Sequence, residues 1–307
     1  MALCLTLFPV ISCAGEPSAT LHRPGDDGYI PTSADALDFG ISSGQAFVYD
    51  VEGEQYLYLK GASRVLYPAS TTKLLTILYA LTLLSPDTEV TPRDELDLVE
   101  AGSSIAYIKS HHTLTVEMLI EGMLLPSGND AAYALAAAGG RALLGEVAAD
   151  GRTAVSAFMD GMNRYAAQIG LCGSSFLTPD GNEEQGQHYS TVEDMTLVAR
   201  LAAENELIMR YAGMSSDDVV YASGETNHWE NTNLLLHPDS EFYSPLVTGL
   251  KTGSLGKGKY SVIVTAEIGE KQYIIGVFAA ETSKDRFRDA LLIVNGLRQF
   301  SELSDMR

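Results

Sequence analysis

Runs of strand-forming residues lie toward both ends of the chain, whereas the apolar residues of the middle follow a helical period. The strands predicted from these runs are residues 45–50, 55–60, 246–252, 260–267 and 272–280. The Ala- and Leu-rich middle favours helices, among them 116–124, 130–138 and 192–203, and a last helix is predicted over 285–300. We therefore expect an α/β (α+β) fold in which both chain ends build one antiparallel sheet, flanked by helices, with a helical lobe inserted at about 92–235.

One segment departs from the amphipathic pattern. Residues 71–84 are apolar on nearly every side, which predicts a buried helix rather than a surface one. The Pro-, Gly-, Ser- and Asp-rich residues 14–40 are typical of a flexible tether. The folded domain is therefore expected to occupy residues 41–307.

The amino terminus has the features of an export signal. Residues 1–12 are apolar but shorter than the roughly 20 residues that a membrane-spanning helix needs. Val10-Ile11-Ser12-Cys13 resembles a bacterial lipobox, in which the cysteine is lipidated; an ordinary signal peptide with an incidental cysteine is the alternative. Residues 1–13 are thus predicted to direct export, to the outer face of the membrane, the periplasm or the cell wall.

Charge and cysteine content exclude several classes of function. The 307-residue chain has a net charge of −20, which would repel nucleic-acid phosphates. Its three cysteines are too few for a disulfide framework, and no Cys/His spacing predicts a zinc site. His111 and His112 are adjacent, so on a helix or strand they are expected to point apart. We expect neither a metal site nor a nucleic-acid partner.

Three short motifs carry candidate chemistry. Ser70 and Lys73 share a helix face, where a buried lysine could act as the base that a weakly nucleophilic serine requires. Ser127-Gly128-Asn129 follows Pro126 in a loop between two helices and could present a hydroxyl and a carboxamide. Lys251-Thr252-Gly253 ends a predicted strand within a group of basic residues, which suggests an anionic ligand. Each motif alone also fits an ordinary structural role.

The order of these motifs is more informative than any one of them. Ser-x-x-Lys, Ser-x-Asn and Lys-Thr-Gly in this sequence form the signature of serine β-lactamases and penicillin-binding proteins. Across residues 40–300 the chain resembles the low-molecular-mass penicillin-binding proteins, the serine-type D-alanyl-D-alanine carboxypeptidases. The segments that carry the resemblance are PASTTK, Gly102-Ser103-Ser104, LLPSGNDAAYALA, Met162-Asn163, Tyr189-Ser190-Thr191, Asn231-Thr232-Asn233-Leu234-Leu235 and GLKTG.

The resemblance implies a β-lactamase/DD-peptidase-like fold and a set of roles. Ser70 would attack the bond between the two D-alanines of a peptidoglycan pentapeptide stem, with Lys73 as base and Ser127 as proton relay. The substrate-binding residues would be Asn129, Lys251, Thr252, Gly253, Ser254 and Arg286. β-Lactam antibiotics would acylate Ser70, and no cofactor would be needed.

Other functions remain open. The same machinery serves DD-endopeptidases, transpeptidases and β-lactamases, and a catalytically dead cell-wall-binding module is possible in principle. Two positions depart from the common pattern of the family: Gly258-Lys259 stands where an Ala-Gly pair is frequent, and Asn182 stands where a Leu is frequent. Both are expected near the rim of the cleft, so they bear on substrate preference more than on reaction type.

Overall fold

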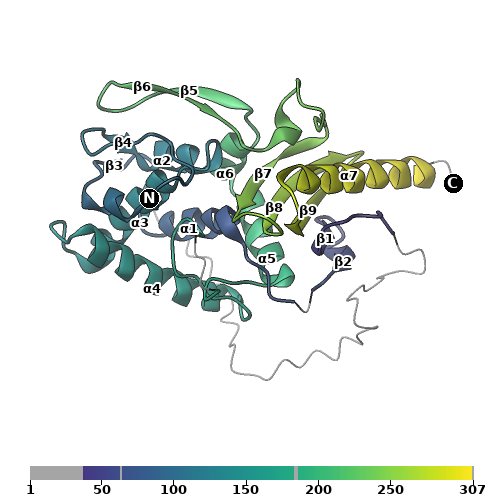
Figure 1. Cartoon of the computed structure of the whole chain (residues 1–307), viewed down its shortest axis with the longest axis horizontal. Coiled ribbons are helices and arrows are strands. Elements are labelled where there is room, and N and C mark those ends of the chain that lie inside the picture. Colours follow the sequence, from purple (N-terminus) through teal and green to yellow (C-terminus); the bar gives the residue numbers. More distant parts are fainter. Residues whose placement is uncertain (1–36, 63, 183–185, 306–307) are drawn as a thin grey trace, which may run out of the picture.

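The computed structural model describes residues 37–62, 64–182 and 186–305, so the predicted export signal and most of the tether, Cys13 included, lie outside the described residues. A five-stranded antiparallel sheet with the order β2-β1-β9-β8-β7 lies at the centre (Figure 1). Its strands are β1 (Gln45–Asp50), β2 (Gln55–Lys60), β7 (Val247–Ser254), β8 (Tyr260–Ile268) and β9 (Lys271–Ala280). Strands from both ends of the chain thus form one sheet, as predicted.

Alternating side chains make both faces of this sheet apolar. The face toward the helical lobe carries Phe47, Tyr49, Leu59, Ile263, Ile274 and Phe278. The opposite face carries Ala46, Val48, Val262, Val264, Ile275 and Val277, and α7 (Ser283–Asp305) covers it with Phe287, Ala290, Ile293, Val294 and Leu297. The sheet is therefore the middle of three layers, and it separates two hydrophobic cores.

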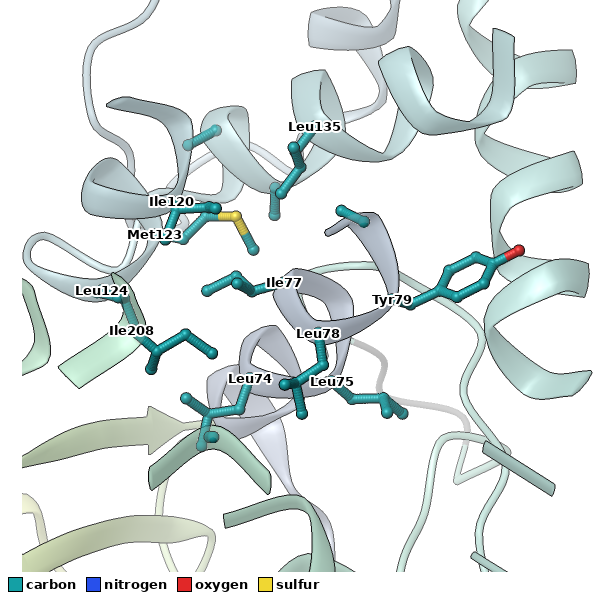
Figure 2. Close-up of a cluster of buried hydrophobic side chains, with 14 of the residues drawn as sticks. Leu74, Leu75, Ile77, Leu78, Tyr79, Ile120, Met123, Leu124, Leu135 and Ile208 are labelled. Atoms are coloured by element: carbon teal, nitrogen blue, oxygen red, sulfur yellow. The ribbon is translucent and has the colours of Figure 1, made fainter. Parts of the chain in front are cut away.

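Helix α1 (Lys73–Ala80) is the buried helix that the sequence predicts. All eight of its residues are buried, and its side chains contact neighbouring helices on several sides (Figure 2). The helix is shorter than the predicted 71–84. The 3-10 helix η1 (Ala69–Thr72) precedes it, and it ends at Ala80 in a series of turns. Ser70 therefore lies in a 3-10 turn and not in the first turn of an α-helix.

The inserted lobe consists mainly of helices. These are η2 (Asp94–Leu98), α2 (Val116–Leu124), α3 (Asn129–Leu144), α4 (Gly151–Ile169), α5 (Val192–Ala203), α6 (Glu206–Ala212) and η3 (Leu234–Leu236). Two small antiparallel pairs complete it: β3 (Glu89–Val90) with β4 (Leu114–Thr115), and β5 (Ser216–Val220) with β6 (Thr226–Glu230). The β5–β6 hairpin lies where the sequence predicted no strand.

Candidate active site

Ser70 and Lys73 form the centre of the site. The ammonium nitrogen Nζ of Lys73 donates a hydrogen bond of 2.9 Å to Oγ of Ser70. Lys73 is completely buried, whereas Ser70 is partly exposed and lines a cleft of about 350 Å³. The serine hydroxyl can therefore meet a ligand from solvent while the amine behind it is shielded from water.

Burial is the main influence on Lys73. Desolvation lowers its pKa from 10.5 to about 8, against the opposing effect of Asp180 and Asp130. Its Nζ also donates to Oδ1 of Asn129 at 2.7 Å and to the carbonyl oxygen of Asp180 at 3.4 Å. About half of Lys73 is consequently neutral near pH 8, and a minority is neutral at pH 7; the neutral amine is the state that can accept a proton.

The Ser127-Gly128-Asn129 segment lies beside this pair, at the start of α3. Ser127 is buried and has a φ of 61°, a left-handed conformation that turns the chain sharply into the helix. Asn129 contacts Lys73 directly. The expected link between Ser127 and Lys73 is absent: within the described residues, the hydrogen bonds of Lys73 go to Ser70, Asn129 and Asp180.

Asp130 holds one wall of the cleft in place. Its carboxylate accepts hydrogen bonds from the backbone N–H groups of Ala106, Ile108 and Ala131, at 2.8, 2.8 and 2.9 Å. On the other side, the carbonyl oxygen of Ala106 accepts from Nε1 of Trp229 at 3.0 Å. The wall segment, residues 100–108, is thus held between α3 and the β5–β6 hairpin. Sequence analysis did not assign a role to Asp130 or Trp229.

Two glycines let the backbone come close to the Ser70 turn. A Cβ on Gly253 would lie 2.8 Å from the carbonyl oxygen of Pro68 and 3.0 Å from Cβ of Ala69. A Cβ on Gly181 would lie 1.9 Å from the carbonyl oxygen of Ala69. Strand β7 and the 180–182 loop therefore press on the turn from two directions, which explains the need for Gly253 on steric grounds.

Lys251 and Thr252 lie on β7 next to this contact. Lys251 is buried, and desolvation together with the charges of Lys73 and Arg286 puts its pKa well below the ordinary value. The hydroxyl of Thr252 shares a hydrogen bond of 2.5 Å with that of Thr232. The structure thus brings the Lys-Thr-Gly motif to the side of the Ser-x-x-Lys motif.

Arg286 reaches the same strand from α7. It donates to the carbonyl oxygens of Gly253 and Ser261 at 2.6 and 3.2 Å and to Oγ of Ser254 at 2.9 Å. Only 5% of Arg286 is exposed, and burial lowers its pKa to about 10. These contacts place it behind the end of β7, where it fixes Ser254 at the cleft.

Three other basic residues that follow the Lys-Thr-Gly motif in the sequence do not gather at the site. Ion pairs on the surface join Lys257 to Glu281 at 3.0 Å, Lys284 to Glu241 at 2.8 Å and Arg288 to Asp285 at 2.5 Å. For these three residues, solvated surface charge is the better interpretation. Lys251 and Arg286, by contrast, are buried.

The expectation that His111 and His112 point apart is wrong. They lie in a turn, with ring centroids 4.5 Å apart, and their nitrogens and a carboxylate oxygen of Glu225 lie within 4.8 Å of one another. Two of the three groups already have polar partners: Nδ1 of His112 accepts from Lys109 N, and Glu225 accepts from Ser223. The arrangement gives no reason to assign a metal.

A cleft serine paired with a buried lysine, between an antiparallel sheet and a helical lobe, defines a serine peptidase that uses lysine in place of histidine. The chain belongs to the peptidase S11 family, the D-alanyl-D-alanine carboxypeptidases, which it matches over residues 31–282. The family and the β-lactamase/DD-peptidase-like fold predicted from the motifs are thereby confirmed.

Named relatives agree with this assignment. The chain is 32% identical over 235 residues to D-alanyl-D-alanine carboxypeptidase DacF of Bacillus subtilis, covering 75% of this chain and 55% of that protein. It is 34% identical over 248 residues to the D-alanyl-D-alanine carboxypeptidase of Streptomyces sp. K15, covering 78% of this chain and 81% of that protein. The chain thus spans little more than half the length of the Bacillus subtilis protein.

Solved structures show the same fold. The Streptomyces K15 DD-transpeptidase superimposes with a TM-score of 0.74 at 30% identity, over 83% of this chain and 97% of that one. Penicillin-binding protein D2 of Listeria monocytogenes, in an ampicillin-bound form, superimposes with a TM-score of 0.67 at 28% identity, over 85% and 99%.

Proposed function

We propose that this protein is a serine-type D-Ala-D-Ala carboxypeptidase, which removes the terminal D-alanine from peptidoglycan stem peptides. The observation that carries the proposal is the hydrogen bond between the partly exposed hydroxyl of Ser70 and the buried amine of Lys73. Membership of the carboxypeptidase family supports the substrate class.

The reaction begins with the neutral form of Lys73. Its amine takes the proton of Ser70 while Oγ bonds to the carbonyl carbon between the two D-alanines. The C–N bond then breaks, and the leaving amine receives the proton that Lys73 took from Ser70. Ser127 relays this proton once substrate binding brings its hydroxyl to Lys73, a contact that the described residues of the structure do not contain. Water hydrolyses the resulting ester and restores the Ser70 hydroxyl.

The remaining motif residues bind the two sides of the scissile bond. Oδ1 of Asn129 accepts from Lys73, which leaves its amide N–H groups to donate to the carbonyl on the acyl side. Lys251 and Thr252 bind the terminal carboxylate, whose negative charge favours the protonated form of Lys251. The backbone N–H groups of Ser70 and Ser254 stabilise the oxyanion, and Gly253 gives the backbone close access to the Ser70 turn.

Two assays on separate samples test the proposal: labelling with a fluorescent penicillin, and incubation with a synthetic pentapeptide ending in D-Ala-D-Ala. We expect a long-lived adduct, release of D-alanine, and the loss of both in Ser70→Ala. Removal of one partly exposed hydroxyl leaves the packing intact, so Ser70→Ala should keep its melting temperature. Rapid penicillin turnover would indicate a β-lactamase. A complete absence of labelling would indicate a catalytically dead cell-wall-binding module.

A DD-transpeptidase is the second candidate, and the structural similarity to the Streptomyces K15 DD-transpeptidase favours it. In that reaction an amine, instead of water, attacks the ester on Ser70. Adding glycine as an acceptor to the pentapeptide assay separates the two activities. If the main product is the peptide with glycine in place of the terminal D-alanine, the enzyme is a transpeptidase. Cleavage of cross-linked peptide dimers would indicate an endopeptidase.

Arg286 is proposed to support recognition of the substrate carboxylate through Ser254 and the Gly253 carbonyl, which it contacts. Arg286→Ala should weaken hydrolysis of a peptide with a free carboxylate more than hydrolysis of its amidated analogue. An equal effect on both peptides would limit Arg286 to a structural role.

The family acts on the cell wall, so we propose that the protein is exported and that Cys13 carries a lipid anchor. None of the helices in the described part of the chain has the length and apolarity that a bilayer span requires. Two or three acyl chains hold a lipoprotein stably on a membrane. Cys13→Ala should move the protein from the membrane fraction to the periplasm or medium at unchanged specific activity. A soluble wild-type protein lacking a modified Cys13 would contradict the anchor.

A further inference from the structure

The cleft beside Ser70 carries a negative charge on one wall. Among the described residues that line it, Glu100 is the one charged side chain. The other lining residues are uncharged, and most of them are small or polar. Glu100 is exposed, so its carboxylate is available to a ligand. A cleft with mostly polar, uncharged lining and one carboxylate discriminates ligands mainly by charge.

Two hydrogen bonds fix the position of Glu100, one to its side chain and one to its backbone. Its Oε2 accepts a hydrogen bond of 2.5 Å from Nδ2 of Asn182, which lies in the 180–182 loop. Its backbone carbonyl accepts from the hydroxyl of Ser103 at 2.7 Å. Because a carboxylate has about four acceptor sites, the bond to Asn182 leaves room for a further donor.

The two sides of Ser70 therefore differ in charge. On the β7 side lie Lys251 and Thr252, which the proposed function assigns to the carboxylate of the departing D-alanine. The wall formed by residues 100–104 and the 180–182 loop remains for the acyl side of the substrate, to which the proposed function also assigns Asn129, and Asn129 lines the same cleft as this wall. A cationic group on the acyl part of the peptide would meet Glu100.

We propose that Glu100 is a specificity-determining residue that favours stem peptides with a free amine on the side chain preceding D-Ala-D-Ala. The inference rests on the proposed function and deepens it, because it names the class of peptide that this cleft accepts. Asn182 is a positioning residue, since its side-chain amide orients the Glu100 carboxylate without neutralising it.

The test compares two matched peptides, diacetyl-L-Lys-D-Ala-D-Ala and its relative with a free ε-amine, by kcat/KM for D-alanine release. An exposed ion pair contributes about 1 kcal/mol at most, so we expect a two- to fivefold preference for the free amine. In Glu100→Gln, the ratio of kcat/KM for the two peptides should fall to near one. Glu100→Lys should instead prefer a third peptide, in which succinylation gives the lysine side chain a negative charge, over the peptide with the free ε-amine. The wild-type preference should also shrink at high salt.

Glu204→Gln is the matched control, because it removes one exposed carboxylate at the end of α5 and should leave the ratio of the two peptides unchanged. Penicillin labelling of each variant reports whether the Ser70 site is intact. Equal hydrolysis of both peptides by the wild type, or an unchanged ratio in Glu100→Gln, overturns the inference. Failure of the wild type to hydrolyse either peptide would instead overturn the proposed function.

Discussion

At the scale of single residues, the site depends on one amine kept away from water. Lys73 has three hydrogen-bond acceptors but no direct carboxylate partner among the described residues. The side-chain carboxylates of Asp180 and Asp130 act on it only through their charges, which raise the pKa of Lys73 less than burial lowers it. A carboxylate in contact would hold the lysine protonated and unable to serve as a base.

The pH dependence of acylation should report this balance. Because the neutral amine is the active form and its pKa is about 8, the rate of penicillin labelling should rise about tenfold per pH unit below that value and level off above it. Stopped-flow labelling between about pH 5.5 and 9.5, which brackets this pKa, measures the profile. A flat profile over this range would exclude Lys73 as the titrating base.

The sequence was sufficient to find the residues that react and insufficient to find those that tune them. Ser70 and Lys73 are three positions apart, a local spacing that any helical turn brings together. Asp180 and Trp229 act across long stretches of chain, on Lys73 and on Ala106, and no local pattern encodes such contacts. Glu100 likewise gained significance only when folding brought it beside Ser70 and Asn182.

At the scale of elements, the cleft wall at residues 100–108 follows η2 and has no helix or strand of its own, so its shape depends on side chains from elsewhere. Asn227 and Trp229 donate hydrogen bonds to the carbonyl oxygen of Ala106. The carboxylate of Asp130, in the first turn of α3, accepts hydrogen bonds from two backbone N–H groups of the wall. The same carboxylate also raises the pKa of Lys73. Wall position and base strength are therefore coupled through one residue.

Asp130→Asn should change both properties. An asparagine side chain has one acceptor oxygen, so its NH2 group would face one of the backbone N–H groups that the carboxylate now accepts from. We expect this change to lower the free energy of unfolding by about 1–3 kcal/mol. Loss of the negative charge should lower the pKa of Lys73, so the midpoint of the acylation profile should move to lower pH. Urea denaturation and the stopped-flow profile measure the two effects.

The control is Asp239→Asn, which removes one exposed charge away from the cleft and should change neither quantity. A midpoint that stays in place while stability falls would confine Asp130 to holding the wall.

Strand prediction succeeded for segments rich in apolar and aromatic residues and failed for the β5–β6 hairpin, which has few of them. In β1 every residue is buried, whereas in β5 and β6 one residue each, Val219 and Trp229, is buried. Such a hairpin has too few apolar positions to form a recognisable strand-forming run. Its existence depends on the anchoring of Trp229 against Ala106, which is a tertiary contact.

At the scale of the whole molecule, the two hydrophobic cores share one sheet and the sheet joins both ends of the chain. β1 lies between β2 and β9 in the sheet. A strand that precedes the inserted lobe in the sequence therefore pairs with a strand that follows the lobe. Ser70 lies in η1, directly against β7 and ahead of α1. We therefore expect the lobe, the sheet and α7 to unfold as one cooperative unit.

Ile293→Ala tests this expectation from the side farthest from the lobe. Ile293 is fully buried under α7, and its truncation should cost about 2–5 kcal/mol through lost transfer energy and a residual cavity. Trp229, the single tryptophan, lies in the other core, on β6. In urea, its fluorescence midpoint should shift by the same amount as the circular-dichroism midpoint, and penicillin labelling should be lost at that same concentration. If the Trp229 transition keeps its wild-type midpoint while the circular-dichroism transition moves, the lobe unfolds independently of the sheet and the single-unit description is wrong.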